Sequence, residues 1–342
     1  MNSYMKDVRR ALENYDIEVL GIRTESYKGK KGVWWIRTPK GQKILKKQSH
    51  SVKTLDFILA GVEHLMRNGI KIPEIIKTKE GNDYALVDNT CYVLSEAIDG
   101  KTLDYSSARS IERIVGELAK FHRASVGFAP PENCKVRTHL GLWIEKYQKE
   151  VDKLKGYYEM EKSKSSHTSF GRIILKEYPY FYRRMEDALN GFNDAPYQMW
   201  VNEVEQTGAL CHQDFTAGNL IYTEAKDLYV LDTDSLTIDI PLRDIRKILN
   251  KIMKRKKQWD MELVEDILGY YQKKNPLESW KWEVLRPTLT YPHLFTGIMS
   301  KYYERREKTW TEQKYLSRLK EMITIEKSLD PIIENFDNIR PL

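Results

Sequence analysis

The side chains with the clearest potential for chemistry lie in one predicted loop and just behind the predicted hairpin that follows it. Asp214 and Asn219 are five residues apart in that loop, and Asp232 comes thirteen residues after Asn219. Metal-assisted phosphoryl transfer needs such a set: one carboxylate takes the proton of the attacking hydroxyl, while an amide and a second carboxylate hold Mg²⁺ against nucleotide phosphates. We therefore expect Asp214 to be the catalytic base and Asn219 and Asp232 to bind Mg²⁺. The alternative is that Asp214 and Asn219 only form turns, as residues of these types often do.

A lysine that contacts the phosphates of ATP is expected on the strand-forming segment 42–46. This segment resembles the kinase strand that carries such a lysine. Lys46 is the expected residue, because it follows two apolar residues. The alternative interpretation of its neighbours Lys43 and Lys47 is that they are solvated surface charges.

The segment 91–103 is similar to the strand and hinge that join the two lobes of kinases. Backbone groups of Glu96, Ala97 and Ile98 are therefore expected to face an adenine. Together with Lys46 they form the predicted nucleotide-binding set.

Several features depart from the usual kinase pattern. Two residues of the next predicted helix, Asp56 and Glu63, are candidates for the acid that pairs with the phosphate-binding lysine, and neither is assigned. The turn at 28–32 has two glycines but lacks the spacing G-x-G-x-x-G. Gln213 stands between His212 and Asp214, where small-molecule kinases commonly have glycine, and the chemistry neither requires nor forbids it.

Four further polar residues are expected to support the site. In related folds the histidine at the position of His212 packs beneath the loop, so we expect a structural role for it. His122 lies on the apolar face of a predicted helix and is expected to be a core histidine with a backbone or carboxylate partner. Asp244 lies at a position similar to that of an aspartate that braces the catalytic loop in kinases, and this resemblance implies the same role here. Asp234 is either a second metal ligand or a helix cap, and we favour the cap.

The first hundred residues read as β structure with one helix. Short strands are predicted at 17–23, 33–37, 42–46 and 91–97, and a hairpin at 75–78 and 84–87. Residues 51–68 have apolar side chains at helical spacing. This pattern predicts a β-rich N-terminal lobe over residues 1–98, and the resemblance of its segments to kinases implies that this lobe binds the nucleotide.

After Gly100 the pattern changes to long helices. They are predicted at 108–125, 139–163 and 171–191 and again from about 242, with one hairpin at 220–222 and 228–231. We therefore expect a helical C-terminal lobe over 99–342 that carries the catalytic loop and the substrate-binding helices, with a ligand in the cleft between the lobes.

Composition excludes several classes of protein. The chain has 342 residues, 56 Lys and Arg against 49 Asp and Glu, a net charge of +7 and 21 Tyr. A basic, Tyr-rich chain suggests nucleic-acid binding, but the charges are spread over helices of mixed sign without a single-sign stripe, so no nucleic-acid partner is expected. Three scattered Cys indicate a reducing compartment. The sequence has neither a secretory signal nor a run long enough to span a membrane, so we expect a soluble protein made in the cytoplasm, with no membrane partner.

The motifs together resemble one known superfamily. The segment 116–122, the hinge end 98–100, the catalytic loop and Leu231-Asp232 are similar to the aminoglycoside phosphotransferases and choline kinases, over about residues 15–305. Within that superfamily the chain looks most like the CotS-type spore coat proteins of endospore-forming bacilli. This narrower resemblance rests on segments 69–73 and 125–128 and on Tyr291-Pro292 ahead of Tyr302-Tyr303.

The resemblance implies an α+β, bilobal protein-kinase-like fold with ATP and Mg²⁺ as cofactors. It also implies an ATP-dependent phosphotransferase that acts on a hydroxyl of a small or sugar-like molecule. Synthesis in the cytoplasm would be followed by assembly into the spore coat, with other coat proteins as partners. The alternative is a structural coat component on the same fold with little or no turnover.

Overall fold

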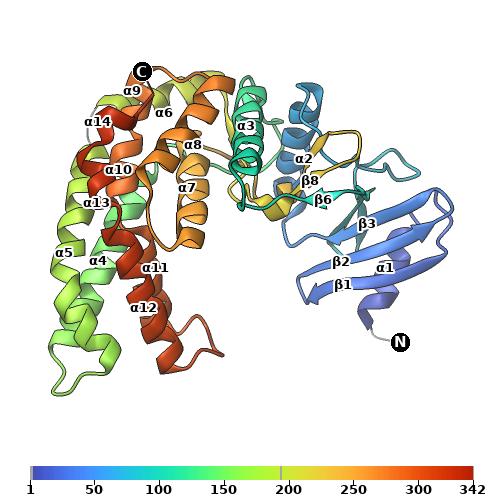
Figure 1. Cartoon of the computed structure of the whole chain (residues 1–342). Coiled ribbons are helices and arrows are strands. Elements are labelled where there is room, and N and C mark those ends of the chain that lie inside the picture. Colours follow the sequence, from blue (N-terminus) through green and yellow to red (C-terminus); the bar gives the residue numbers. More distant parts are fainter. Residues whose placement is uncertain (1–2, 193–194, 342) are drawn as a thin grey trace. The chain divides into compact units, whose positions relative to one another are not determined.

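The computed structural model describes residues 3–192 and 195–341 and divides the chain into two compact units (Figure 1). Unit 1 holds the residues up to Asp104 together with Arg123–Thr138 and Thr216–Thr237, and unit 2 holds Tyr105–His122, His139–Phe215 and the residues from Ile238 onward. The α+β fold class is confirmed. The division into continuous lobes at 1–98 and 99–342 stays a prediction; two later segments join the first hundred residues in unit 1.

Unit 1 is built on a five-stranded antiparallel sheet in the order β1-β2-β3-β5-β4. The strands are β1 (Gly21–Lys28), β2 (Lys31–Thr38), β3 (Gly41–Lys47), β4 (Ala85–Val87) and β5 (Thr90–Glu96). Helix α1 (Ser3–Leu12) packs on one face, against Trp34, Leu45 and Leu94, and Figure 1 shows it beside β1 to β3. On the other face α2 (Val52–Arg67) packs against Cys91 and Val93. The two faces are therefore covered by different helices.

Strand alternation decides which lysine of β3 faces which helix. Side chains two apart on a strand share a face. Lys43 shares the face of Leu45, which packs with α1, whereas Lys46 pairs in register with Val93 on the α2 side. Lys46 and Lys43 therefore point to opposite faces of the sheet.

Two strand predictions in this unit are wrong. The first strand begins at Gly21 and runs to Lys28, not over 17–23. Segment 75–78 does not pair with 84–87: Ile75 bridges to Ser95 and the Ile76 N–H donates to the Leu94 carbonyl, so this segment runs along β5. β4 pairs with β5 instead, across a two-residue turn at Asp88 and Asn89.

A second, three-stranded sheet in unit 1 holds the predicted metal ligands. Its order is β6-β8-β9, with β6 (Lys101–Thr102), β8 (Leu220–Tyr222) and β9 (Leu228–Val230). The predicted hairpin is confirmed, with Leu220 opposite Val230. The 3-10 helices η1 (Ala217–Asn219) and η2 (Thr233–Ser235) flank this hairpin. The hairpin therefore sets Asn219 and the segment around Asp232 at its two open ends.

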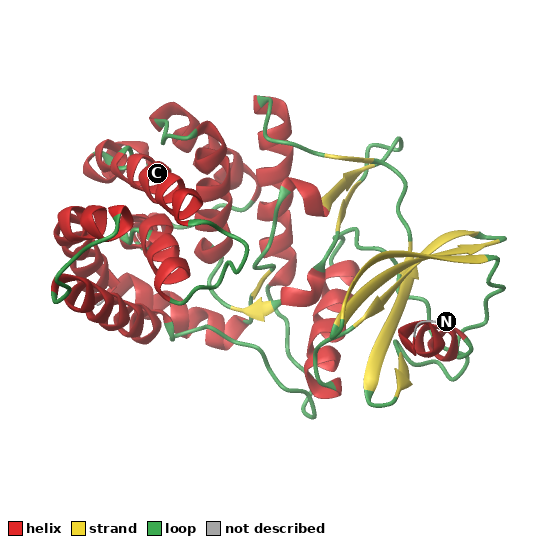
Figure 2. Cartoon of the chain, turned by 90° about the horizontal axis from the view of Figure 1, so that it is seen from below, coloured by secondary structure: helices red, strands yellow, loops and turns green. Residues whose placement is uncertain are grey.

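Unit 2 is almost wholly helical, as the red ribbons of Figure 2 show. Its helices are α3 (Ala108–Ser125, in this unit up to His122), α4 (Trp143–Lys162), α5 (Ser169–Phe192), α6 (Ala195–Thr207), α7 (Leu242–Lys256), α8 (Met261–Lys274), α9 (Ser279–Glu283), α10 (Leu285–Thr290), α11 (His293–Tyr303), α12 (Glu312–Lys327), α13 (Asp330–Glu334) and α14 (Phe336–Ile339). Along the chain, β7 (Leu210–Cys211) precedes the catalytic loop and β10 (Thr237–Ile238) precedes α7. Among the described residues, no helix combines the length and the apolar character needed to cross a bilayer.

Buried polar contacts tie the helices of unit 2 together. The buried Arg184 of α5 donates to the carbonyls of Leu289, Thr290 and Glu326. Its guanidinium also pairs with the Glu326 carboxylate at 3.4 Å. Because a buried charge without partners is costly, these contacts fix α5 against α10 and α12.

Candidate active site

The predicted site residues fall into two groups, one in each unit. Unit 1 holds Lys46, Asn219 and Asp232, and unit 2 holds Asp214 and His212. Asp214 and Asn219 nevertheless belong to one eight-residue connection, 212–219, between β7 and β8.

In unit 1 the structure brings Lys46 and Asp232 together although 186 residues separate them. The Lys46 Nζ donates to the Asp232 carboxylate at 3.2 Å. The Asp234 carboxylate lies 3.9 Å from the same Nζ and 3.9 Å from the Nζ of Lys31. Two carboxylates and two ammonium groups therefore share this part of unit 1.

Asn219 is held beside Asp232 by the backbone of the hairpin. Its carbonyl accepts from the N–H of Leu231, the residue before Asp232, at 2.8 Å, and its own N–H donates to Thr216 at 2.9 Å. Asp232 itself has a left-handed backbone with φ of +56°. Asp tolerates this region better than most residues, and such strain is found at functional sites.

These side chains suit a hard divalent cation. The amide oxygen of Asn219 and the carboxylate oxygens of Asp232 are of the kind that Mg²⁺ prefers. The half-exposed Asp232 carboxylate lies beside the ammonium group of Lys46, so a metal ion bound to Asp232 would lie close to the lysine that is expected to contact the phosphates. The donor set therefore fits Mg²⁺.

The expectation that Asp234 caps a helix is wrong. The N-cap of η2 is Asp232, while Asp234 lies inside that turn with its carboxylate near two lysines. Its backbone carbonyl accepts from Arg137 at 2.6 Å. Asp234 is thus an oxygen donor beside Asp232 rather than a cap.

Neither predicted partner acid contacts Lys46. Asp56 accepts a hydrogen bond from the Tyr84 hydroxyl, and Glu63 pairs with Arg67. Lys46 is paired instead with the aspartates of the later segment.

Lys43 is not a solvated charge. It is 6% exposed, and its Nζ donates to the Glu96 carboxylate at 2.6 Å. The N–H groups of Glu96 and Ala97 are also used within the unit, since they donate to Glu74 and Gln42. Of the three predicted adenine-facing residues, Ile98 is the one whose N–H makes no backbone hydrogen bond in the described chain.

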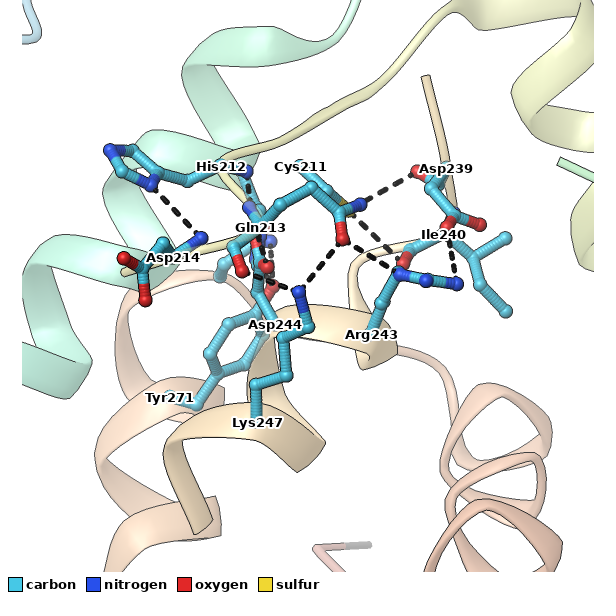
Figure 3. A network of polar contacts seen from close by, with 12 residues as sticks. Cys211, His212, Gln213, Asp214, Asp239, Ile240, Arg243, Asp244, Lys247 and Tyr271 are labelled. Carbon is cyan, nitrogen blue, oxygen red and sulfur yellow. Dashed lines mark hydrogen bonds and ion pairs between the residues drawn. The ribbon is translucent and has the colours of Figure 1, made fainter. Parts of the chain in front are cut away.

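In unit 2, Asp244 holds the start of the catalytic loop. Its carboxylate accepts from the N–H groups of His212 at 2.6 Å and Gln213 at 2.9 Å (Figure 3). It also contacts the His122 ring at 3.3 Å. Burial works to raise the pKa of the Asp244 carboxyl, but the hydrogen bond and charge of His122, with His212 and Lys247, outweigh it and lower that pKa. The prediction that Asp244 braces the loop is confirmed.

The two histidines are structural, as predicted. The Nδ1 of the buried His212 accepts from the N–H of Asp214 at 3.3 Å, which places the proton of a neutral ring on Nε2. The His212 ring packs edge-to-face on Phe121 and Phe215. His122 has the expected carboxylate partner and a second contact to the Tyr271 hydroxyl at 2.8 Å.

Gln213 is a residue whose role the sequence did not reveal. Its φ of +70° is left-handed, the conformation that explains why glycine suits this position. Its Oε1 accepts from Arg243 Nε at 2.8 Å and from Lys247 Nζ at 2.9 Å, and its carbonyl accepts from the same Nζ. Gln213 thus latches the loop to α7 directly before Asp214 (Figure 3).

Asp214 itself is exposed at the end of this latch. Its carboxylate lies 3.5 Å from the Nζ of Lys251, the next cation along α7. A carboxylate that is accessible, held at its backbone and balanced by an ammonium group can accept a proton from an incoming hydroxyl.

Comparison with known proteins shows which family the chain belongs to. The family described as "Spore coat putative kinase YutH" matches residues 24–336. Spore coat protein S of Bacillus subtilis strain 168 is 30% identical over 332 residues, which are 97% of this chain and 94% of the relative. The chain belongs to the spore coat YutH family. The predicted resemblance to spore coat proteins is therefore confirmed.

Solved structures agree with the kinase-like fold of this YutH-family chain. An aminoglycoside phosphotransferase from Alicyclobacillus acidocaldarius subsp. acidocaldarius DSM 446 has a TM-score of 0.79 at 16% identity, covering 96% of this chain and 95% of the other. Spectinomycin phosphotransferase in complex with ADP and spectinomycin has a TM-score of 0.66 at 12% identity, covering 98% and 99%. At these identities the likeness concerns the fold alone, and it confirms the predicted kinase-like fold.

Proposed function

We propose that this YutH-family chain is an ATP-dependent phosphotransferase that acts on a hydroxyl of a small or sugar-like molecule. The observation that carries the proposal is the ion pair of Lys46 with Asp232, next to Asn219. A lysine on the third strand and an oxygen-donor set behind a hairpin are the parts that hold nucleotide phosphates and their metal in kinases. Spectinomycin phosphotransferase, which shares the fold, is described in complex with ADP.

Each predicted residue has a role in this proposal. Lys46 binds the α- and β-phosphates, while Asn219 and Asp232 hold Mg²⁺, whose charge would offset that of the phosphates. The backbone at Glu96 to Ile98 faces the adenine, with the Ile98 N–H as the available donor.

Asp214 acts on the acceptor. As the acceptor oxygen forms its bond to the γ-phosphorus, the bond from that phosphorus to the bridging oxygen breaks and ADP leaves with the electron pair. The hydroxyl proton passes to the Asp214 carboxylate. Asp244, His212 and Gln213 hold Asp214 through the backbone contacts described above.

Nucleotide binding is tested by thermal unfolding. ATP with Mg²⁺ at millimolar concentration should raise the melting temperature of the wild type, because a ligand that binds only the folded state stabilises it. Asp232→Ala should abolish the shift, and Glu63→Ala, which removes an exposed acid paired only with Arg67, should keep it. Absence of a shift in the wild type would exclude nucleotide binding at this site.

We further propose that the protein works in association with the spore coat, after synthesis in the cytoplasm. The support is its family and its relative Spore coat protein S. Other coat proteins are then its expected partners. If ATP turnover does not depend on Asp214, the alternative of a structural coat component replaces the enzymatic proposal.

A further inference from the structure

Helix α7 carries almost only positive charge. Its fifteen residues include one acid, the buried Asp244, and seven basic residues: Arg243, Arg246, Lys247, Lys251, Lys254, Arg255 and Lys256. The expectation that no single-sign stripe exists in the chain is therefore wrong for this helix.

The position of these cations on α7 is not explained by helix stability. Cations in the last turn, such as Lys254 to Lys256, are favoured by the negative end of the helix dipole. Arg243, Arg246 and Lys247 lie in the first half, near the positive end, where the dipole disfavours them. Arg243 and Lys247 are explained by their contacts to Gln213, which leaves Arg246 as the cation of the three whose position needs another explanation.

Five cations of α7 share one side of the helix. At about 100° per residue, Arg246, Arg243, Lys254, Lys247 and Lys251 fall within an arc of about 140° that is outside the apolar face. We call these five residues the α7 cation row.

The cations of the row differ in how they are neutralised. Arg243 pairs with the buried Asp239 at 3.3 Å, and Lys251 lies near Asp214. Lys247 bonds only to the uncharged Gln213 among the contacts described. The row therefore has more positive charge than its neighbours offset.

Arg246 is the most informative member. In the described part of the chain its guanidinium has neither an ion pair nor a hydrogen bond, and its Nε is shut off from solvent. Burial lowers its pKa, and the charge of Arg243 lowers it further. Proteins rarely leave a buried N–H of a guanidinium without an acceptor, so the Nε of this half-buried residue suits an anionic ligand.

The surroundings of Arg246 suit a small molecule. The ring of Tyr147 on α4 stacks on Tyr291 at 4.4 Å and lies 5.6 Å from His293 of α11. Burial, followed by the charges of Arg246 and Arg243, holds the pKa of His293 well below its usual value, so that this ring is neutral. Aromatic rings beside a guanidinium are typical of a site that holds a ring or chain by its apolar face and its anionic group by charge.

We propose that the phosphoryl acceptor is a hydroxyl compound with an anionic group, a carboxylate or a phosphate, which Arg246 binds while the hydroxyl lies at Asp214. The proposal rests on the proposed phosphotransferase function. Arg246 and Lys251 are five residues apart on α7, or about 7.5 Å along the helix axis. The two residues also lie about 140° apart around the helix axis, with Arg243 and Lys247 between them, so positive charge continues along the row from Arg246 to the cation beside Asp214.

The same row disfavours amines. Aminoglycosides and spectinomycin, the compounds for which the two structural neighbours are named, bear amino groups. Such cations would be repelled by the α7 cation row. The acids near the row include Asp214 and Glu321, which are not buried, and the buried and engaged Asp239, Asp244 and Glu326. Glu150 acts on Tyr147 and Tyr291.

Four hexoses that differ in charge provide the test. Binding to the full chain is measured by calorimetry without nucleotide, using glucuronate, glucose 6-phosphate, glucose and glucosamine. We expect at least one of the two anions to bind more tightly than glucose, and glucosamine to bind least. If neither anion binds more tightly than glucose, the proposal is overturned.

Variants of Arg246 test whether this residue binds the anionic group. Arg246→Gln should weaken binding of the preferred anion by about 10- to 100-fold, the usual effect of losing hydrogen bonds to a charged group. Arg246→Lys should retain part of it. The matched control is Arg183→Gln on α5, which makes the same charge change at an exposed residue and should leave binding unchanged.

Measurements of ATP binding and turnover distinguish failure of the anionic acceptor from failure of the phosphotransferase function. Arg246→Gln should leave the affinity for ATP with Mg²⁺ unchanged, and an equal loss of ATP affinity would mean that the row serves the nucleotide, which overturns the proposal. If the wild type binds the anion through Arg246 but binds no ATP, the phosphotransferase function fails while the anion site stands. If ATP binds and turnover is faster with glucosamine than with either anion, the anionic acceptor is wrong and the phosphotransferase function stands.

Discussion

The latch between Gln213 and α7 can be tested by two substitutions at one residue. Gln213→Ala removes the side-chain acceptor of Arg243 and Lys247 but keeps a Cβ in the left-handed backbone. Gln213→Gly removes the same acceptor and relieves the backbone strain. Comparison of the two variants therefore separates the hydrogen bonds from the strain.

The magnitudes follow from the contacts. A hydrogen bond to a charged donor contributes about 1.5 to 3 kcal/mol, and this site is half-buried, so two bonds at the lower end give about 3 kcal/mol. The left-handed backbone costs a non-glycine residue about 1 kcal/mol. We expect Gln213→Ala to lower the free energy of unfolding by about 3 kcal/mol and Gln213→Gly by about 2 kcal/mol.

Urea-induced unfolding followed by tryptophan fluorescence measures both values. The bond from Lys247 to the backbone carbonyl of residue 213 remains in both variants and acts as an internal control. If Gln213→Gly proves more stable than the wild type, the side-chain bonds are worth less than the strain and the latch is refuted.

Three further predictions concern other parts of the chain. Burial raises the pKa of Asp239 to about 6, above its unfolded value of 3.8, so the folded state binds a proton more tightly than the unfolded state and stability should fall by about 3 kcal/mol as pH rises from about 4 to 6. Asp239→Asn should remove this fall when urea midpoints are measured across that pH range, and an unchanged pH dependence in the variant would contradict the prediction. Glu96→Gln leaves the buried Lys43 without its carboxylate and should cost about 2 kcal/mol in the same unfolding assay, whereas a neutral effect would show that water replaces the pair. Gly100→Ala places a Cβ 2.6 Å from the Tyr222 carbonyl oxygen and should cost about 1 to 3 kcal/mol, seen as a lower melting temperature, while an unaltered value would mean that β6 moves freely.

The sequence predicted the parts of the site that lie in short motifs. The hairpin after Asn219 was predicted from two apolar segments and a turn, and its register places Leu231 on Asn219 and so brings Asp232 close. The role of Asp244 as a brace was also predicted, because its spacing from the loop matches the family. In both cases the information is local along the chain or fixed by a motif.

Other features depend on contacts that no local pattern encodes. The partner of Lys46 is 186 residues away, so the predicted acids on α2 were wrong. The lack of partners around Arg246 becomes visible only once α4, α7 and α11 are packed. The pairing of β4 with β5 does have a local signal: Asp88 and Asn89, with φ of +47° and +61°, form the two-residue hairpin turn between these strands.

The central claim is that the loop of Asp214 catalyses phosphoryl transfer, and the rate of ADP formation from ATP with Mg²⁺ tests it most directly. The rate is measured for the wild type and Asp214→Asn at saturating ATP, with glucuronate or glucose 6-phosphate as acceptor. We predict that Asp214→Asn binds ATP as the wild type does and forms ADP about 10²- to 10⁴-fold more slowly, the usual contribution of a general base. Equal rates in the two proteins would contradict the claim and leave a coat protein on a kinase-like fold.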